Sequence, residues 1–279
     1  MPPAATARHA DAALTPEQHA AWERDGYVIV RGLWSRAEID ACRERFDDLA
    51  ANAPDQPPHW EPDRNSSDPL KRYPRVMHPH RIDGLSRAML LDPRVGAILR
   101  RLLGEEPIAT QSMFYFKPPG GRGQALHQDN FYLKVAPQTC VAAWTAVDAA
   151  TPENGGLFVC PGTHGMEVAC PEAADAAESF TTDLVRPPAG VVPVPAVLGP
   201  GDVLFFNGSV VHGSKPNTTA DRWRRSFICH YAPASAEAIG SHYKPCFRFD
   251  GREHRGFADA TGGGPCGEPF DAAAAAGAA

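Results

Sequence analysis

The first predicted helix is marked by its polar ends rather than by a strong apolar stripe. Thr15-Pro16-Glu17-Gln18 places a capping threonine before a proline at the first helical position, with a glutamine three residues after the cap. Gly26 predicts the end of this helix, because glycine readily adopts the left-handed conformation that closes a helix. The apolar run Tyr27 to Val30 then predicts a strand.

Two further helices are predicted in the first hundred residues. Ser35-Arg36-Ala37-Glu38 is a second capping box, and the pattern behind it predicts a helix to about Ala50. Asp92-Pro93 predicts another helix, which Gly104 closes. Between them, residues 52–69 contain prolines, asparagines and serines without periodicity, which predicts a loop near the mouth of a site.

From Ile108 to Tyr231 short apolar runs alternate with glycine and proline turns, the pattern of a β domain. Val203 to Phe206 is a short buried strand, and residues 110–117 form a longer one. Trp223 to Tyr231 alternates, so every second side chain should share a face. One face of this strand would carry Arg224, Ser226, Ile228 and His230. Residues 167–195 are a long insertion that could cover a site.

We expect one folded domain with tails at both ends. Residues 1–14 should be disordered, and residues 261–279 form a flexible tail rich in glycine and alanine. The domain between them, 15–260, would have a helical part at 15–104 and a barrel part at 105–260.

Composition narrows the function classes. The net charge of −6 and the pI near 6.0 argue against a nucleic-acid-binding or anionic-membrane surface. The seven cysteines show no paired short spacing, which predicts reduced thiols. No secretory signal and no apolar run of membrane-spanning length is present, so we expect a cytoplasmic protein. Oligomeric state is not readable from the sequence.

Three separated residues could bind one divalent metal. His127 and Asp129 lie at i and i+2, so in a strand both would point to one face. His212 follows another apolar run, where a buried histidine needs a partner. Two histidines and one carboxylate leave about three octahedral positions open, the facial triad of non-haem Fe(II) oxygenases.

A basic residue should lie near this triad to hold an acidic co-substrate. An arginine that enters a barrel interior needs an anionic partner, and its planar guanidinium binds a carboxylate in bidentate fashion. Arg224 fits best, with Arg222 and Arg225 as competitors. For Arg222 a solvated basic edge is the preferred interpretation.

The motifs together resemble the phytanoyl-CoA dioxygenase family of Fe(II)- and 2-oxoglutarate-dependent oxygenases, from roughly Thr15 to Ala234. Each motif is weak, but their order and spacing are specific. The motifs are Asp25 to Val30, Lys117-Pro118-Pro119, Leu126 to Asp129, Ala143 to Asp148, Glu153 to Leu157, Pro161 to His164, Pro200-Gly201-Asp202, and His212-Gly213-Ser214 with Asn217 behind it.

The resemblance implies a mainly β fold with flanking helices, a double-stranded β-helix (jelly-roll, cupin-like) barrel. It implies His127, Asp129 and His212 as iron ligands, and 2-oxoglutarate and O2 as co-substrates. Arg224 matches the arginine that pairs with the far carboxylate of 2-oxoglutarate, although it lies twelve residues after His212 where the family usually has eleven. Ser214 matches a hydroxyl that holds the same carboxylate, and the pocket would be lined by Trp144 and Met113.

The substrate is expected to be a small molecule, with neither nucleic acid nor membrane as partner. Its contacts should come from the first strands, the loop around residues 78–81 and the insertion. The candidates are Gln111, Tyr115, Gln128, Phe131, Tyr132, His78 and Arg81.

Hydroxylation of an aliphatic C–H bond is the favoured reaction, because Asp129 is present where halogenating relatives have a small residue. A composition rich in alanine, arginine and proline suggests a GC-rich bacterial genome and a step in secondary metabolism. The alternatives are desaturation, cyclisation or epimerisation by the same oxidative chemistry, acyl-CoA hydroxylation, and a non-catalytic cupin-like metal-binding protein.

Overall fold

The computed structural model describes residues 14–260, so of the terminal segments expected to be disordered or flexible, residues 1–13 and 261–279 lie outside the described residues. Short 3-10 turns occur at Pro79–Arg81, Thr163–Gly165 and Ser241–Tyr243. The helices are α1 (Pro16–Asp25), α2 (Arg36–Asn52), α3 (Pro69–Arg72), α4 (Gly84–Leu90), α5 (Pro93–Leu103) and α6 (Asn130–Leu133).

The capping signals correctly predicted where α1, α2 and α5 begin. Thr15 and Ser35 each accept a hydrogen bond from the backbone three residues later, and the side chains of Gln18 and Glu38 return it. Gly26 closes α1 in the left-handed conformation, with φ 79°. The short helices α3, α4 and α6 were not predicted, because their sequences carry too few turns for a periodic pattern.

The larger of the two main sheets contains eight strands. Its strand order is β1-β10-β5-β12-β3-β14-β15, with β2 also paired to β3, and these pairings are antiparallel. The strands are β1 (Tyr27–Val30), β2 (Val76–Met77), β3 (Pro107–Tyr115), β5 (Val141–Ala146), β10 (Val203–Asn207), β12 (Ser226–Pro233), β14 (Cys246–Phe247) and β15 (Glu253–His254).

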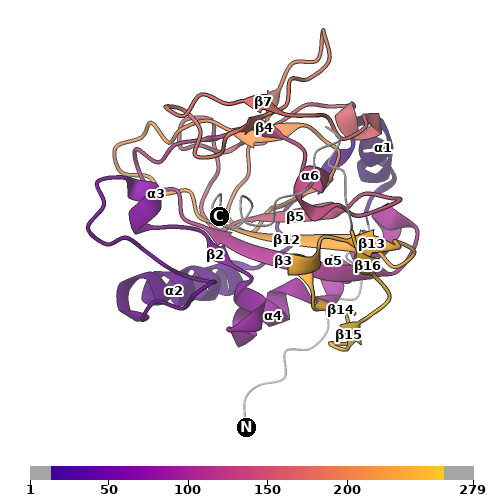
Figure 1. Ribbon diagram of the computed structural model, residues 1–279, viewed down its shortest axis with the longest axis horizontal. Coiled ribbons are helices and arrows are strands. Elements are labelled where there is room, and N and C mark those ends of the chain that lie inside the picture. The colour runs from indigo at the N-terminus through magenta and orange to yellow at the C-terminus, as the bar shows by residue number, and fades with distance from the viewer. Residues whose placement is uncertain (1–13, 261–279) are drawn as a thin grey trace.

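A smaller antiparallel sheet faces the large one, in the order β4-β11-β6-β9 (Figure 1). Its strands are β4 (Gln124–His127), β6 (Leu157–Val159), β9 (Val194–Pro195) and β11 (His212–Ser214). Two further pairs are β7 (Glu172–Ala173) with β8 (Asp183–Leu184), and β13 (Ala238–Ile239) with β16 (Ala258–Asp259). Two facing sheets of this kind are the expected double-stranded β-helix, open at the edges rather than a closed barrel.

The two faces of the large sheet bury different cores. On its outer face helix α2 packs Phe46 against Phe114, with ring centroids 3.8 Å apart, in a cluster that also holds Phe227 and Tyr231. Figure 1 shows α2 and α4 on this side of the sheet. The inner face packs against the small sheet through Met113, Trp144, Ile228 and Phe206. The expected alternation along β12 is therefore confirmed, and any site between the sheets lies on this inner face.

The insertion at residues 167–195 lies beside the small sheet. Strand β8 runs next to β4, and the backbone of Val185 donates to Leu126 at 2.6 Å. Its last residues form β9, which pairs with β6. The insertion is therefore attached to the sheet that carries His127.

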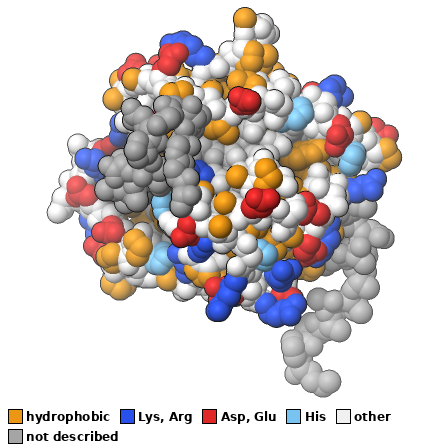
Figure 2. Space-filling model, turned by 45° about the vertical axis from the view of Figure 1, so that its right-hand side comes forward, with side chains coloured by type: hydrophobic (Ala, Val, Ile, Leu, Met, Phe, Trp, Pro, Cys, Tyr) orange, Lys and Arg blue, Asp and Glu red, His pale blue; other side chains and the backbone are white. Residues whose placement is uncertain are grey.

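On the face seen in Figure 2 the acidic and basic side chains are interspersed rather than gathered in one patch. No helix among the described residues is long and apolar enough to span a membrane.

Buried free thiols occur at Cys42, Cys140, Cys160, Cys229 and Cys246. Cys170 is disulfide-bonded, so the expectation of wholly reduced cysteines is wrong for that residue.

Candidate functional site

Two histidines of the small sheet face each other across neighbouring strands. His127 ends β4, His212 begins β11, and the two residues are direct partners in the register with ring centroids 4.2 Å apart. The Nδ1 atoms lie 2.8 Å from the Ala125 carbonyl and 3.0 Å from the Val210 carbonyl. Because a carbonyl oxygen only accepts, each Nδ1 is the donor of these bonds, so Nε2 is the nitrogen of each ring that a metal could use.

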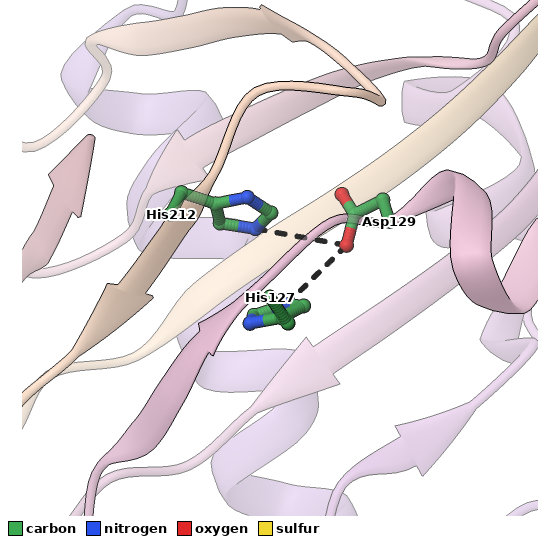
Figure 3. A group of neighbouring side chains, drawn as sticks. All are labelled: His127, Asp129 and His212. Atoms are coloured by element: carbon green, nitrogen blue, oxygen red, sulfur yellow. Dashed lines mark ion pairs between the residues drawn. The ribbon is translucent and has the colours of Figure 1, made fainter. Parts of the chain in front are cut away.

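Asp129 completes the cluster, but not from the predicted strand. Strand β4 stops at His127, and Asp129 has helical backbone angles at the start of α6. The i, i+2 argument from strand geometry was therefore wrong, although the side chains do converge. Oδ1 of Asp129 lies 3.4 Å from Nε2 of His127 and 3.6 Å from Nε2 of His212 (Figure 3).

These three side chains are buried, and their ionisation states favour binding of a divalent cation. Their possible ligand atoms lie within 4.8 Å of one another, and within residues 14–260 no other group of histidine, cysteine and acidic side chains meets this condition. Burial would raise the pKa of Asp129, but His212, His230 and His127 hold it well below its ordinary value. Burial lowers the pKa of His212 to about 4. An ionised carboxylate beside a neutral imidazole is the ligand state that metal binding requires.

Two more polar side chains contact this cluster. Nε2 of His230 lies 2.9 Å from Oδ2 of Asp129, the oxygen that faces away from the other two histidines. The amide nitrogen of Gln124 lies 3.1 Å from Nε2 of His127, on the side where a metal would sit.

Arg224 enters the space between the sheets just before β12. It is only 3% exposed, and its guanidinium donates to the Gly155 carbonyl at 3.1 Å and to Oγ of Ser226 at 2.7 Å. The guanidinium also lies 5.5 Å from the ring centre of Trp144. Its two competitors are placed differently: Arg225 pairs with Asp148 and Asp47, and Arg222 is exposed.

Lys117 is a second buried cation, just beyond the end of β3. It is 1% exposed, and its Nζ donates to Oγ of Ser214 at 2.7 Å and to the backbone carbonyls of Lys215 and Gly155 at 3.0 and 3.3 Å. Gly155 accepts from Lys117 and from Arg224, so it joins the two cations in one site.

Neither cation has an acidic partner. Within the described part of the chain no carboxylate forms an ion pair with Lys117 or Arg224. Burial holds the pKa of Lys117 well below its ordinary value, and the positive charge of the neighbouring Arg224 lowers it further. Burial also lowers the pKa of Arg224 to about 10. Charging two neighbouring buried basic side chains without an anion is costly, so this region, which we call the anion site, favours binding of an acidic ligand.

The other predicted co-substrate residues line the same space. Met113 and Trp144 belong to the apolar cluster between the sheets, next to Ile228. Ser214 supplies the hydroxyl that accepts from Lys117. These side chains surround the anion site, and Trp144 packs directly on the guanidinium of Arg224.

Three of the predicted substrate residues, Gln111, Tyr115 and Tyr132, lie around this space, and Phe131 contacts Tyr132. Gln111 is 3% exposed, sits opposite His230 in the sheet, and makes no side-chain hydrogen bond to any described residue. The hydroxyl of Tyr115 accepts from Arg75 at 3.0 Å. Tyr132 lies 6.1 Å from the ring of His127 and 5.2 Å from that of Phe131.

Three predicted substrate residues have other roles. Gln128 uses its whole amide on the backbone of Glu167, Ser209 and Ala169, so it is not available to a substrate. Arg81 donates to the backbone of His242 and Lys244. The ring of His78 packs against His80 and Tyr243 rather than against the triad.

Sequence reasoning missed two residues of the site, Lys117 and His230. In the sequence Lys117 stands out only as part of the motif Lys117-Pro118-Pro119. The argument applied to Arg224, that a charge at the end of a buried strand needs an anion, would have identified it. His230 was assigned to the correct face of β12, but its contact with Asp129 spans 101 positions and carries no local signal.

The comparisons with known proteins agree with this geometry. The family model for phytanoyl-CoA dioxygenase (PhyH) matches residues 22–226. Phytanoyl-CoA dioxygenase domain-containing protein 1 of Bos taurus is 27% identical over 291 residues, which cover 84% of this chain and 94% of that protein. Methylphosphonate hydroxylase of Gimesia maris is 29% identical over 254 residues, which cover 90% and 91% of the two chains.

Solved structures share the fold. EctD from S. alaskensis, solved with 2-oxoglutarate and 5-hydroxyectoine, has a TM-score of 0.64 and 23% identity over 84% of this chain and 81% of its own. The epimerase SnoN, solved with Fe3+, alpha ketoglutarate and nogalamycin RO, has a TM-score of 0.62 and 24% identity over 79% and 84%. At these identities the likeness carries the fold alone, and it confirms the predicted double-stranded β-helix.

Proposed function

Because the chain belongs to the phytanoyl-CoA dioxygenase family, we propose that it hydroxylates an aliphatic C–H bond of a small molecule. Members of this family are 2-oxoglutarate-dependent non-haem iron dioxygenases, so the chain is an oxidoreductase that uses Fe(II), 2-oxoglutarate and O2. It is therefore an enzyme rather than a metal-storage protein. The substrate and the position oxidised belong to the proposal.

One observation carries the residue assignments: three buried side chains whose ligand atoms converge lie next to two buried basic side chains that form no ion pair with a described carboxylate. A single buried histidine is usually a core residue with hydrogen-bond partners, so the triad alone would be weaker evidence. The combination of the triad and the two basic side chains between the same two sheets supports a site for a divalent metal and an acidic co-substrate together.

His127, Asp129 and His212 would hold the iron. Two neutral imidazoles and one carboxylate suit Fe(II), and a site with three protein ligands leaves positions for exchangeable ligands. The fit is supported by the bond from each Nδ1 to a backbone carbonyl, which leaves both Nε2 atoms on the side of Oδ1 of Asp129. Bound iron with 2-oxoglutarate and O2 would supply the oxidising power for C–H cleavage.

Arg224, Lys117 and Ser214 would hold a carboxylate of 2-oxoglutarate. A guanidinium binds a carboxylate in bidentate fashion, and the ammonium adds a second charge in a region that excludes water. Trp144 and Met113 would exclude water from this end and keep the guanidinium in place. The protein thus contributes binding, orientation and a dry space.

The substrate would enter on the side of Gln111, Tyr115 and Tyr132. The amide of Gln111, which has no hydrogen-bond partner among the described residues, would orient a polar group of the substrate. The rings of Tyr115 and Tyr132 would pack against its apolar part. A natural-product intermediate in a bacterial cytoplasm is the substrate class we propose. Acyl-CoA hydroxylation is the alternative, in view of the relatives named for phytanoyl-CoA.

A different outcome of the same oxidation is the second candidate. SnoN, which shares the fold, is described as an epimerase, so the fold by itself does not select hydroxylation. Product mass separates the outcomes: hydroxylation adds one oxygen, desaturation removes two hydrogens, and epimerisation leaves the mass unchanged.

The test is a screen of compound classes scored by succinate release that depends on the compound, on Fe(II) and on O2. The proposal expects at least one class to raise succinate release, with a product one oxygen heavier. Succinate release that is unchanged in the His127→Ala variant would refute the assignment of this residue as an iron ligand. A product of unchanged or lower mass would refute hydroxylation in favour of the second candidate.

A further inference from the structure

We propose that His230 is a positioning residue for the iron ligand Asp129: it holds Oδ2 so that only Oδ1 is presented to the metal. This inference rests on the proposed iron site and extends it to a residue outside the triad. No step of the oxidation itself is assigned to His230.

The hydrogen bond has a defined direction. Nε2 of His230 lies 2.9 Å from Oδ2 of Asp129, and both side chains are buried. An ionised carboxylate oxygen can only accept, so Nε2 must be the donor. Oδ1, the other oxygen, is the one that lies within 3.6 Å of both triad imidazoles. One oxygen is therefore directed to the metal and the other to His230.

Each of the three proposed ligands has its own orienting partner, but only one of these partners is a side chain. His127 and His212 donate to the backbone carbonyls of Ala125 and Val210, which no substitution removes. Asp129 is oriented by His230, which a substitution does remove. Partners of this kind fix ligand geometry, and their loss typically weakens metal binding about 10- to 100-fold.

Asp129 depends on such a partner because its own backbone gives it little support. It stands at the start of α6, a helix of four residues, and its side chain makes no capping hydrogen bond there. Without a partner at Oδ2 the carboxylate could rotate and present either oxygen, or both.

The backbone of His230 is held by the large sheet, whereas the Nδ1 atom of its ring has no hydrogen-bond partner among the described residues. His230 lies on the inner face of β12 opposite Gln111, where the register between β12 and β3 shifts. The hydroxyl of Thr110 donates to the His230 carbonyl at 2.9 Å and holds the backbone at this irregular point. A strand of the large sheet thus supplies the donor to a ligand that stands at the start of a short helix.

The test measures metal affinity rather than turnover. We would titrate metal-free protein with Mn(II), followed by electron paramagnetic resonance, for wild type, His230→Phe and His230→Gln. Phe keeps an aromatic ring without a donor, and Gln restores an N–H donor. The inference expects about 10- to 100-fold weaker binding for His230→Phe, with partial recovery for His230→Gln.

Cys229→Ala is the matched control. Cys229 is the neighbouring buried residue of β12 on the opposite face, where it packs in the outer core. Thermal unfolding of each metal-free variant separates stability from affinity. Weaker binding in Cys229→Ala as large as in His230→Phe would overturn the inference, as would His230→Phe binding Mn(II) within twofold of wild type.

A measurement on the wild-type protein covers the case in which His230→Phe does not fold. In a Zn(II)-loaded sample with ¹⁵N-labelled histidine, the inference expects a proton on Nε2 of His230, and a proton on Nδ1 only would overturn it. If wild type bound no metal at the triad, the proposed function itself would fail. If wild type bound Mn(II) normally and His230→Phe bound it equally well, only the proposed role of His230 would be refuted.

Discussion

The two ends of the site differ in how their charges are balanced. At the metal end the carboxylate of Asp129 is surrounded by three imidazoles, all within hydrogen-bonding or close contact distance. At the anion site, Lys117 and Arg224 are equally buried but have no acidic partner among residues 14–260. The metal end is preorganised by the protein, whereas the anion site is complete only when an acidic ligand is bound.

This difference follows from the sheets that supply the residues. Both triad histidines lie on the small sheet, each held by the backbone carbonyl two residues before it, and Asp129 lies two residues after the end of β4. Lys117 and Arg224 extend from β3 and β12, paired strands of the large sheet, into the space beside Trp144. We therefore expect variants at the metal end to lose metal, and variants at the anion site to lose 2-oxoglutarate while keeping metal.

The largest expected effect is at the metal end. His127→Ala removes one of three ligands, and the metal supplies several kcal/mol of the catalytic effect. We expect turnover to fall at least about a thousand-fold, with metal content after gel filtration falling in parallel. His19→Ala, on the surface helix α1, is the control and should keep both. A His127→Ala protein with normal metal content would break the comparison.

The next largest effect separates the two ends. Arg224→Met should raise the KM for 2-oxoglutarate by about 100-fold, because breaking a buried ion pair costs about 3 kcal/mol. Metal content should remain that of wild type. Arg222→Met is the matched control, since Arg222 is exposed two residues away. A large KM increase in Arg222→Met with none in Arg224→Met would reverse the assignment.

A third prediction concerns protons at the anion site. In the free protein the pKa of Lys117 is well below its ordinary value because of burial and Arg224. A bound carboxylate favours the ammonium, so the pKa should rise in the complex and 2-oxoglutarate binding should take up a proton. The affinity is then highest below the free-protein pKa and falls as pH rises through it, by up to about tenfold per pH unit.

Isothermal titration calorimetry in buffers of different ionisation enthalpy measures this proton uptake. Lys117→Met should abolish it and bind 2-oxoglutarate more weakly. By contrast, burial lowers the pKa of His212 to about 4, so this residue should add no pH dependence to metal binding between about pH 6 and 8. Proton release on 2-oxoglutarate binding would contradict the account of the anion site.

The smallest expected effect tests whether α6 depends on the insertion. The hydroxyl of Tyr132 donates to Asp183 of β8 at 2.9 Å. Tyr132→Phe removes this bond and should lower the free energy of unfolding by about 1 kcal/mol, with kcat changed less than about threefold. Urea denaturation measures the first quantity. Loss of metal in Tyr132→Phe would mean that the metal end is less preorganised than we infer.

The helix ends could be predicted because their signals are local. Thr15 with Gln18, and Ser35 with Glu38, act within one turn, so neighbouring residues in the sequence carry the whole signal. Asp129 was misplaced for the complementary reason: the strand alternation that suggested a shared face ends at His127, where the chain turns into α6. A helix of four residues is about one turn long, so it is too short to show a periodic pattern of apolar residues.

The roles within the site depend on contacts between distant residues. The bond from Lys117 to Ser214 joins positions 97 apart, and that from His230 to Asp129 joins positions 101 apart. Residue types and motif order predicted which residues would gather at the site, but not which polar atoms would pair. Gln128 shows the converse, since it lies between two proposed ligands and yet bonds only to backbone.

The central claim is that three buried ligands hold one iron beside a guanidinium that binds a diacid. The most direct measurement is the visible absorption of anaerobic protein with one equivalent of Fe(II) during a 2-oxoglutarate titration. We predict a charge-transfer band in wild type, none in His127→Ala, and a band in Arg224→Met that requires about 100-fold more 2-oxoglutarate. No band in wild type, or an unchanged band in His127→Ala, would contradict the account.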